Sequence, residues 1–272
     1  MSRLILRLKS DPVQRLDVSS LTPERLAGLS AEEIRGMLLQ CGNRQLPVRE
    51  LFDVSVPESW DTLRFDGGSA RFDYLGRGLT LGTIEVAGSA GAYVGHGMRG
   101  GTIDVAGDVG IFCGAEMRGG TVTVRGSAGD FLGAALPGNK KGMSGGSVVI
   151  FGDAGDRVGD SMRRGLILIK GDAGAYLGSR MTAGTIVAEG SVGPYPGYGM
   201  KRGTLLLFRV PHTLMPTFND CGRHTLGFMT LLLNSLRRLD PSVTIPAGGV
   251  LPVRRYAGDF AAQGKGEILV LD

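Results

Sequence analysis

The 272-residue sequence lacks the features that several classes of protein require. It contains no uninterrupted apolar run of about 18 residues, so we expect no membrane-spanning helix and no membrane partner. Its three cysteines, Cys41, Cys113 and Cys221, are odd in number and far apart, which argues against a disulfide framework and a CxxC pair. The first nine residues alternate charged and apolar side chains and contain no apolar leader. We therefore expect a cytoplasmic protein.

Motifs of catalysis are also scarce. The three histidines, His96, His212 and His224, form no HxH or HExxH pattern, and Cys221 with His224 supplies only half of a metal site. The sequence has no GxSxG and no Walker A motif. The formal net charge is only +4, so the chain has no large excess of positive charge with which to bind a polyanion such as nucleic acid. We expect no catalytic residue, no bound metal and no nucleic-acid partner.

Glycine, by contrast, is abundant, and it follows a repeat. Of the 46 glycines, 32 lie between Gly82 and Gly203. Twelve prolines are too few for collagen, and a 42% hydrophobic content is too high for a disordered linker. Steps of 19 residues, with one step of 26, separate the glycines Gly88, Gly107, Gly126, Gly152, Gly171 and Gly190, and likewise the methionines Met98, Met117, Met143, Met162, Met181 and Met200. The long step indicates a seven-residue insertion within residues 135–142.

Each repeat contains a short aliphatic segment of period two, bounded by glycine, which is typical of a β-strand between tight corners. Stacking such strands predicts a mainly β fold, a right-handed parallel β-helix of about seven 19-residue rungs over residues 61–209. Equivalent positions should then form ladders in the core. Two aliphatic ladders are Ile84, Ile103, Val122, Val148, Ile167, Ile186 and Leu205, and Val86, Val105, Val124, Ile150, Ile169, Ala188 and Leu207. The methionines form a third ladder, and Tyr93, Phe112, Phe131, Tyr176 and Tyr195 form an aromatic one interrupted by Arg157.

The position between the two aliphatic ladders changes character along the repeat. It is polar in the early rungs, at Glu85, Asp104 and Thr123, and apolar in the late rungs, at Val149, Leu168, Val187 and Leu206. A strand that is apolar on both faces is covered on both. We therefore expect the four late residues to form an interface, with the C-terminal segment of the chain, with a partner protein, or with both.

The flanks do not carry the repeat. Residues 1–60 are predicted to form a small α/β cap. The alternation of Leu4, Leu6 and Leu8 predicts a strand, and a helix start at Pro23 and a capping box at Ser30 predict two short helices. In residues 210–272, apolar residues with helical spacing predict a helix from about His224 to Leu239, followed by an extended tail. This C-terminal segment should pack on the solenoid or on a partner.

Two other solenoid classes fit less well. A left-handed hexapeptide acyltransferase requires aliphatic residues every six positions and a catalytic histidine, and only His96 lies in the rungs. Calcium-binding repeats require a column of aspartates, but that register alternates between the aspartates Asp108, Asp153 and Asp172 and the serines Ser89, Ser127 and Ser191. Calcium binding is therefore not expected.

A basic stripe follows the methionines. The next residues are Arg99, Arg118, Ser144, Arg163, Thr182 and Lys201, and a methionine inside implies an outward neighbour. Lys140 and Lys141 of the insertion lie near this stripe. Like charges stacked on one face repel, which favours an anionic partner, although a solvated face without a partner is the simpler interpretation.

The glycine and methionine array resembles that of the C subunit of formylmethanofuran dehydrogenase and, more distantly, the C-terminal β-helix domain of glutamate synthase. The segments Leu21–Ser30, Gly42–Arg44 with Leu51–Phe52, and Gly258–Leu269 are similar to the ends of that C subunit. The resemblance to the dehydrogenase family spans nearly the whole chain. It implies a scaffold subunit within an enzyme complex whose chemistry lies on other subunits.

Two complexes use such a subunit. The resemblance favours the bacterial formyltransferase/hydrolase complex, which moves a formyl group from tetrahydromethanopterin to a methanofuran analogue and hydrolyses it to formate during formaldehyde oxidation. It implies three other subunit types, two copies of each, and a metal on another subunit. The arginine bias, with only six lysines among 30 basic residues, favours this bacterial form. The alternatives are the archaeal tungsten or molybdenum dehydrogenase and a domain-docking module like that of glutamate synthase.

The resemblance also suggests a ligand for the basic stripe. It implies that the methanofuran analogue carries a polyglutamate chain. Lys140, Lys141, Arg99 and Arg118 are therefore the candidate contacts for that chain, although no cofactor is expected to bind to this chain alone.

Overall fold

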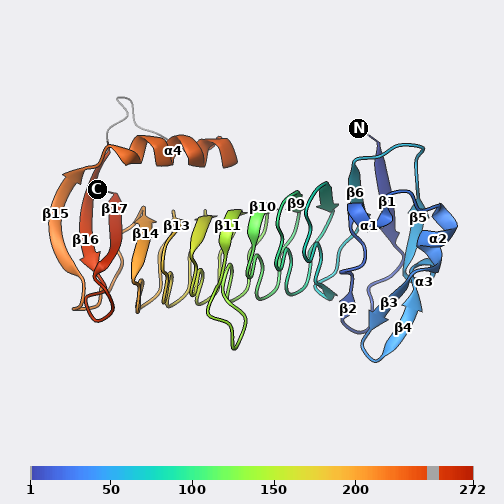
Figure 1. Cartoon of the computed structure of the whole chain (residues 1–272), viewed down its shortest axis with the longest axis horizontal. Coiled ribbons are helices and arrows are strands. Elements are labelled where there is room, and N and C mark those ends of the chain that lie inside the picture. Colours follow the sequence, from blue (N-terminus) through green and yellow to red (C-terminus); the bar gives the residue numbers. More distant parts are fainter. Residues whose placement is uncertain (1, 244–250, 272) are drawn as a thin grey trace.

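The structure, a computed structural model, describes residues 2–243 and 251–271 and is elongated along one axis (Figure 1). Among these residues, 13 strands form one mixed sheet in the order β15-β16-β17-β14-β13-β12-β11-β10-β9-β8-β6-β1-β5, and a smaller sheet has the order β4-β3-β2-β7. The elements are β1 (Arg3–Leu8), β2 (Leu16–Asp17), α1 (Pro23–Leu26), α2 (Ala31–Gly36), β3 (Leu38–Cys41), β4 (Arg44–Pro47), α3 (Val48–Leu51), β5 (Phe52–Ser55), β6 (Thr62–Asp66), β7 (Phe72–Asp73), β8 (Thr83–Val86), β9 (Thr102–Val105), β10 (Arg118–Val124), β11 (Ser144–Ile150), β12 (Arg164–Ile169), β13 (Thr185–Ala188), β14 (Arg202–Leu207), β15 (Asn219–Thr225), α4 (Phe228–Leu239), β16 (Pro252–Gly258) and β17 (Lys265–Leu271).

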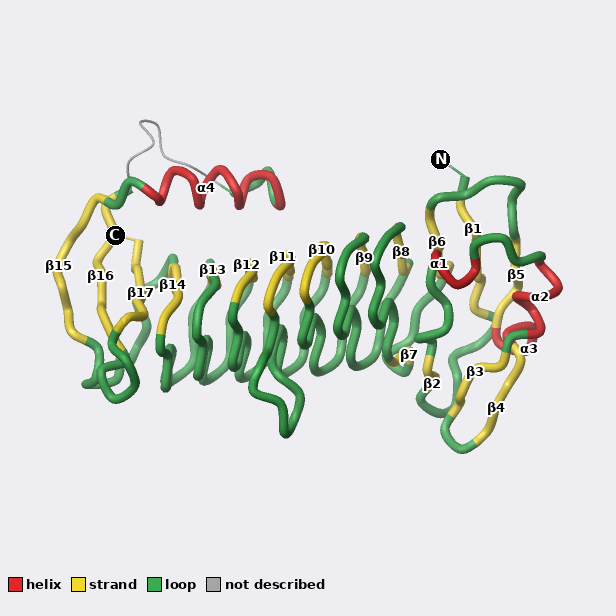
Figure 2. The backbone as a smooth tube through the Cα atoms, in the orientation of Figure 1, coloured by secondary structure: helices red, strands yellow, loops and turns green. Residues whose placement is uncertain are grey.

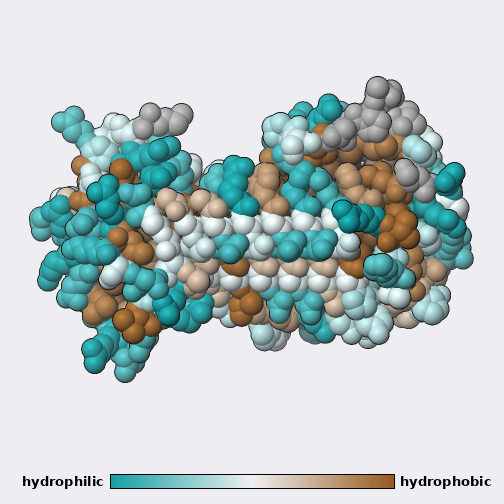
Figure 3. Space-filling model, turned by 180° about the vertical axis from the view of Figure 1, so that it is seen from behind, coloured by the Kyte–Doolittle hydropathy of each residue, from teal (hydrophilic) through white to brown (hydrophobic). Residues whose placement is uncertain are grey.

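The repeat strands β8 to β14 pair in parallel, each with the next, in the register that the 19-residue step predicts. Ile84 pairs with Ile103, and the same column continues to Leu205 across the insertion. On another side of each coil, bridges join Val109, Ala128, Ala154, Ala173 and Val192. Successive coils lie side by side along the long axis (Figure 2). Rows of like hydropathy consequently run lengthwise over the middle of the molecule (Figure 3).

The core contains the predicted aliphatic and methionine ladders. Both aliphatic ladders and all six methionines of the array are at most 2% exposed. Burial of these side chains is the main favourable contribution to folding, at about 25 cal/mol per Å² of apolar surface. The core contains a further buried column, which consists of Leu75, Val94, Cys113, Leu132, Val158 and Leu177.

The expectation that the aromatic column fills the core is wrong for most of its members. Tyr93 and Phe131 are half-buried and Tyr195 is 48% exposed, whereas Phe112 is buried. These residues have a positive φ near 60°, which turns the chain so that the following aliphatic side chain points inward instead. The rings of Tyr93 and Phe112 stack with centroids 5.4 Å apart, so the aromatic column is a ladder at the surface.

The column of aspartates and serines that was considered for calcium has a structural role. The backbone N–H of Ser127 donates to Oδ1 of Asp108 at 2.7 Å, and that of Asp172 donates to Oδ1 of Asp153 at 2.8 Å. Five of the six side chains in this register, all except Ser191, thus accept a hydrogen bond from the next coil. Aspartate and serine are interchangeable here because both supply an acceptor oxygen.

The N-terminal segment extends the large sheet. Strand β1 pairs in parallel with β6 and antiparallel with β5, and Leu4 and Leu6 are fully buried, as the alternation predicts. Helix α1 begins at Pro23, and the predicted capping box of α2 is confirmed, because Ser30 and Glu33 exchange hydrogen bonds. The spacing of Ile34, Met37 and Leu38 after the capping box predicts that all three supply the apolar side of this helix. The prediction is wrong for Leu38, which is 57% exposed and lies in β3, beyond the end of α2 at Gly36.

The C-terminal segment closes the other end. The helix begins at Phe228, later than predicted, because residues 219–225 form β15, which pairs with β16. The predicted end at Leu239 is confirmed. In the tail, β17 pairs in parallel with β14 and therefore continues the sheet edge to edge. Helix α4 does not extend the sheet as β17 does, but lies alongside the late rungs (Figure 1).

Candidate functional site

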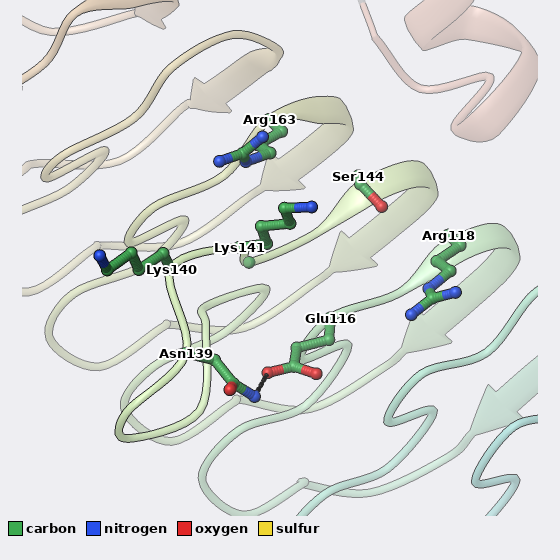
Figure 4. Close-up of a pocket in the computed structure, with 8 residues that line it drawn as sticks. Glu116, Arg118, Asn139, Lys140, Lys141, Ser144 and Arg163 are labelled. Atoms are coloured by element: carbon green, nitrogen blue, oxygen red, sulfur yellow. Dashed lines mark hydrogen bonds between the residues drawn. The ribbon is translucent and has the colours of Figure 1, made fainter.

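The insertion and the basic stripe meet in an open pocket of about 620 Å³ (Figure 4). Arg118 and Ser144 are the first residues of β10 and β11, Arg163 immediately precedes β12, and residues 139–142 of the insertion form one wall. The lining residues are Glu116, Arg118, Asn139, Lys140, Lys141, Gly142, Ser144 and Arg163. Three of the four predicted contacts, Arg118, Lys140 and Lys141, are thereby brought together. Arg99, one rung away, does not line the pocket.

The pocket carries a net positive charge. Arg118, Lys140, Lys141 and Arg163 supply four cations, all exposed, against the single carboxylate of Glu116. Among residues 2–243 and 251–271, none of these four cations forms an ion pair with a carboxylate. The 19-residue register repeats like charges along the stripe, and an anion bound there would relieve their mutual repulsion.

Glu116 holds the insertion in place. Its Oε1 accepts hydrogen bonds from the backbone N–H of Leu136 at 3.2 Å and from Nδ2 of Asn139 at 2.5 Å (Figure 4). At the base of the insertion, the N–H of Ala135 donates to the carbonyl of Asp160, and that of Gly142 to the carbonyl of Ser161. The two lysines are therefore carried on a loop whose ends and middle are both fixed.

Sequence reasoning missed Glu116, although a signal for it exists. The residue before each methionine is glycine in several rungs, such as Gly97 and Gly199, but it is Glu116 in the rung that precedes the insertion. A charged side chain in a glycine column indicates a local role. Arg163 was assigned to the stripe but was not singled out as a contact.

His96 lies next to this arrangement. Its Nε2 is 3.9 Å from Oε2 of Glu116, and its ring packs edge-on against Tyr93. Burial and the nearby Arg77 guanidinium lower the pKa of His96, against the opposing effect of Glu116. His96 is therefore mainly neutral at pH 7, and it adds no full charge to the pocket.

The four apolar residues that were expected to form an interface are covered by the chain itself. Val149, Leu168, Val187 and Leu206 are at most 1% exposed and pack in one cluster with Met229, Leu233 and Leu236 of α4. The helix spans the rungs in which this position is apolar. A partner would reach these four side chains only if α4 moved aside, so their role in contacting another protein stays a prediction.

An ion cluster fixes the C-terminal end of α4. Lys170 Nζ lies 2.8 Å from Oε2 of Glu189 and 2.9 Å from Oδ2 of Asp240. Although burial opposes the shift, hydrogen bonds from Ser242 and Lys170 lower the pKa of Asp240. The cluster therefore anchors the helix to the rung that contains Lys170.

Other candidate chemistry is weak. Within the described part of the chain, no group of three or more His, Cys, Asp or Glu side chains is arranged to hold a metal ion. His224 Nε2 lies 2.9 Å from the carbonyl oxygen of Cys221, so this pair makes a local turn contact. No helix among the described residues has the length and apolar character needed to cross a bilayer.

Comparison with known proteins gives partial matches among curated sequences. No family model matches the chain. The C subunit of the formyltransferase/hydrolase complex Fhc of Methylorubrum extorquens is 44% identical over 86 residues, which is 32% of each protein. The C subunit of a tungsten-containing formylmethanofuran dehydrogenase of Methanococcus maripaludis is 36% identical over 93 residues, or 34% of each. The matched segment thus spans about a third of these curated relatives.

A solved structure matches over nearly the full length. A chain in the crystal structure of the formyltransferase/hydrolase complex (FhcABCD) from Methylorubrum extorquens with methylofuran is 43% identical. The match covers 98% of both chains with a TM-score of 0.90, so it includes both flanks as well as the repeat. The protein therefore belongs to the family of C subunits of formyltransferase/hydrolase and formylmethanofuran dehydrogenase complexes.

Proposed function

We propose that the chain is the non-catalytic scaffold subunit of a four-subunit formyltransferase/hydrolase complex. The complex converts formyl-tetrahydromethanopterin to formate through a formylmethanofuran-type intermediate, in the oxidation of formaldehyde. The observation that carries the proposal is the 43% identity over 98% of a chain from such a complex. The partners are three other subunit types, two copies of each, assembled in the cytoplasm. The metal lies on another subunit.

The scaffold in this proposal is a right-handed parallel β-helix of about seven rungs over residues 61–209. Parallel pairing at 19-residue intervals supports it, as do the bridges along a second row from Val109 to Val192. In this proposal residues 1–60 are an N-terminal α/β cap, and residues 210–272 are a helix and tail that pack on the solenoid or on a partner. Residues 1, 244–250 and 272 lie outside the described residues. Such a solenoid has a rigid surface on which subunits can be held at fixed separations.

The basic pocket is, in this proposal, the place where the chain contacts the shared cofactor. Lys140, Lys141 and Arg118 line it with Arg163, and Arg99 extends the stripe by one rung. A chain of carboxylates such as polyglutamate has the complementary charge and can span several rungs. Each lysine or arginine contact with a carboxylate is charge-assisted, which makes it stronger than a neutral hydrogen bond.

Purification of the tagged chain from cells grown on one-carbon compounds tests the assignment. The proposal predicts three other subunit types and a bound furan-containing cofactor. Recovery of a tungsten- or molybdenum-containing subunit favours the dehydrogenase, and recovery of a flavoprotein or glutaminase favours a glutamate synthase-like role. Either of these results would contradict the proposal.

The cofactor contact has its own test in the assembled complex. Lys140→Glu with Lys141→Glu should lower the amount of cofactor that co-purifies, because the pocket loses two cations and gains two anions. Lys9→Glu with Lys265→Glu changes the net charge equally but lies outside the pocket, and should leave cofactor content unchanged. Equal cofactor content in all three complexes would remove this pocket from the proposal.

A further inference from the structure

A second hollow lies on the other side of the insertion. It measures about 450 Å³, and its walls include the rings of Phe112 and Phe131 together with Leu136 and Pro137. Asp160 and Arg180 supply the charged groups of the lining. We propose that this hollow is an anchor pocket for another subunit, which inserts an apolar or aromatic side chain next to an acidic residue. This inference rests on the proposed function, because it assumes that the chain assembles with other subunits.

The buried carboxylate of the hollow, that of Asp160, is already paired. Asp160 is 2% exposed, and its Oδ1 accepts hydrogen bonds from Ser179 Oγ at 2.7 Å and Arg180 Nε at 2.9 Å. Asn139, also in the lining, donates its amide to Glu116. A site for a small molecule needs several free polar groups that converge on the ligand. Apolar walls with one charged rim residue instead match the pockets that accept anchor residues in protein interfaces.

Arg180 sets the charge preference. Its side chain is 59% exposed, although Nε and Nη2 both bind the buried carboxylate of Asp160. The three remaining N–H donors of the guanidinium are free to face a partner. Asp160 fixes the plane of this group, so little side-chain entropy is lost when a second carboxylate binds. An aspartate or glutamate beside the inserted side chain is the complementary group.

Three residues other than glycine near the insertion have a positive φ, which is an unfavourable backbone conformation for them. Except at Gly142 within the insertion, the residue before each methionine of the array has a positive φ, and in two rungs it is a glycine, at Gly97 and Gly199. Around the insertion the position holds Glu116, Ser161 and Arg180 at φ values of 55°, 60° and 53°. Residues other than glycine are disfavoured in this conformation and tend to be found where a side chain has a function.

All three of these residues contact the insertion or line its hollows. Glu116 binds Leu136 and Asn139, the carbonyl of Ser161 accepts from Gly142, and Arg180 lines the hollow beside residues 135–139. The insertion also projects beyond the outline of the stacked coils (Figure 1). The insertion projects from the coils, is held in place by hydrogen bonds and has a hollow on each side, so a second protein can reach it. The apolar residues Val149, Leu168, Val187 and Leu206 are covered by α4 and cannot be reached in this way.

The co-expressed complex tests the pocket. Pro137→Glu places a carboxylate at the mouth of the hollow, on an exposed residue with no backbone N–H to lose. We expect it to lower recovery of the anchored subunit at least tenfold. Val13→Glu, at a position 89% exposed on the N-terminal segment, is the matched control and should retain recovery within twofold. Equal recovery with both variants would overturn the inference and leave the proposed function standing.

Photo-crosslinking supplies a second measurement that does not depend on the stability of a variant. Benzoylphenylalanine in place of Pro137 should crosslink to a different subunit, at an apolar or aromatic residue with an Asp or Glu within two positions. A crosslink to a second copy of this chain, to a segment without an acidic residue, or to no protein would each overturn the inference. Failure of the unmodified chain to recover any subunit would overturn the proposed function and this inference together.

Discussion

Oε1 of Glu116 accepts a hydrogen bond from Nδ2 of Asn139 at 2.5 Å, across 23 positions of sequence. The bond joins a rung of the sheet to the tip of the insertion that carries Lys140 and Lys141. Glu116 is thus an anion that lines a cationic pocket, yet it positions two of the cations. Its positioning effect and its charge act in opposite directions on the binding of an anion.

Replacing Glu116 separates these two effects. Glu116→Gly removes the negative charge and relieves the positive φ, but it frees the insertion. Reordering even part of the loop costs about 1 kcal/mol, so we expect about fivefold weaker binding of a short polyglutamate probe to the complex. Glu116→Gln keeps an acceptor oxygen and should bind the probe at least as well as the unmodified protein.

Isothermal titration with the probe measures both variants. Faster hydrogen exchange at the Leu136 amide should accompany Glu116→Gly and not Glu116→Gln. Tighter binding by Glu116→Gly would mean that charge alone governs the pocket, and would exclude the positioning role.

The glycines next to the stripe should tolerate no side chain. A Cβ at Gly119 would lie 2.3 Å from the carbonyl oxygen of Arg99 in the preceding rung. Because both atoms belong to stacked backbones, relief requires the coils to separate, and we expect Gly119→Ala to destabilise the protein by at least about 2 kcal/mol. Gly227→Ala is the control, since a Cβ there meets nothing within 4 Å and the residue has helical φ and ψ. Thermal unfolding should show a lower Tm only for Gly119→Ala.

The ion cluster of Lys170 predicts how α4 is attached. Lys170→Met leaves Asp240 and Glu189 without their cation, and loss of these charge-assisted bonds should destabilise the helix contact by about 2 kcal/mol. Hydrogen exchange should accelerate in residues 228–239 and not in β8 and β9. Arg3→Met, which removes an exposed partner of Glu85, should change neither region. Unchanged protection of α4 would contradict the role of the cluster.

The same cluster predicts a dependence on pH. The pKa of Asp240 is lowered in the folded protein, so its contribution to stability is present above its unfolded pKa and is lost as pH falls through the folded value. The pKa of Lys170 is raised by Glu189 and Asp240 despite burial, so its contribution is lost only at strongly alkaline pH. We expect protection of α4 to be constant near pH 7 and to decline below about pH 4. A decline centred near pH 6.5 would point to a histidine instead.

The cysteines should differ sharply in reactivity. Full burial raises the pKa of Cys113 to about 12, so its thiol is neutral and inaccessible in the folded protein. Cys221 is partly exposed and should react first with a thiol reagent, whereas Cys41 is 8% exposed and should react slowly. Mass spectrometry of labelled peptides should detect Cys113 modification only after denaturation. Labelling of Cys113 at the rate of Cys221 would show that the coils open around it.

The repeat made much of the fold predictable because a single register determines every rung. The 19-residue step predicted the strands, the aliphatic and methionine ladders and the place of the insertion. The aromatic column was misassigned because hydrophobicity alone does not report the positive φ that turns Tyr93 and its equivalents to the surface. Strand β15 was missed because Asn219–Thr225 contains no apolar alternation and depends on pairing with β16.

The candidate site was predictable in its charges and not in its geometry. The stripe and the insertion identified Arg118, Lys140 and Lys141, but the register alone could not place Arg99 outside the pocket. The second hollow forms where residues 135–138 fold over Phe112 and Phe131, and the conformation of an insertion is not repeated elsewhere in the sequence. The cover over Val149 was foreseen, whereas the Lys170 cluster depends on a contact 70 positions away with Asp240.

In the proposed function, this chain holds a catalytic assembly together and performs no chemistry itself. The most direct test measures formate release from formyl-tetrahydromethanopterin by the purified chain, by the co-expressed four subunits, and by the three others without this chain. We predict activity only for the four-subunit assembly, and loss of both assembly and formate release when this chain is omitted. Formate production by the isolated chain, or undiminished production without it, would contradict the account.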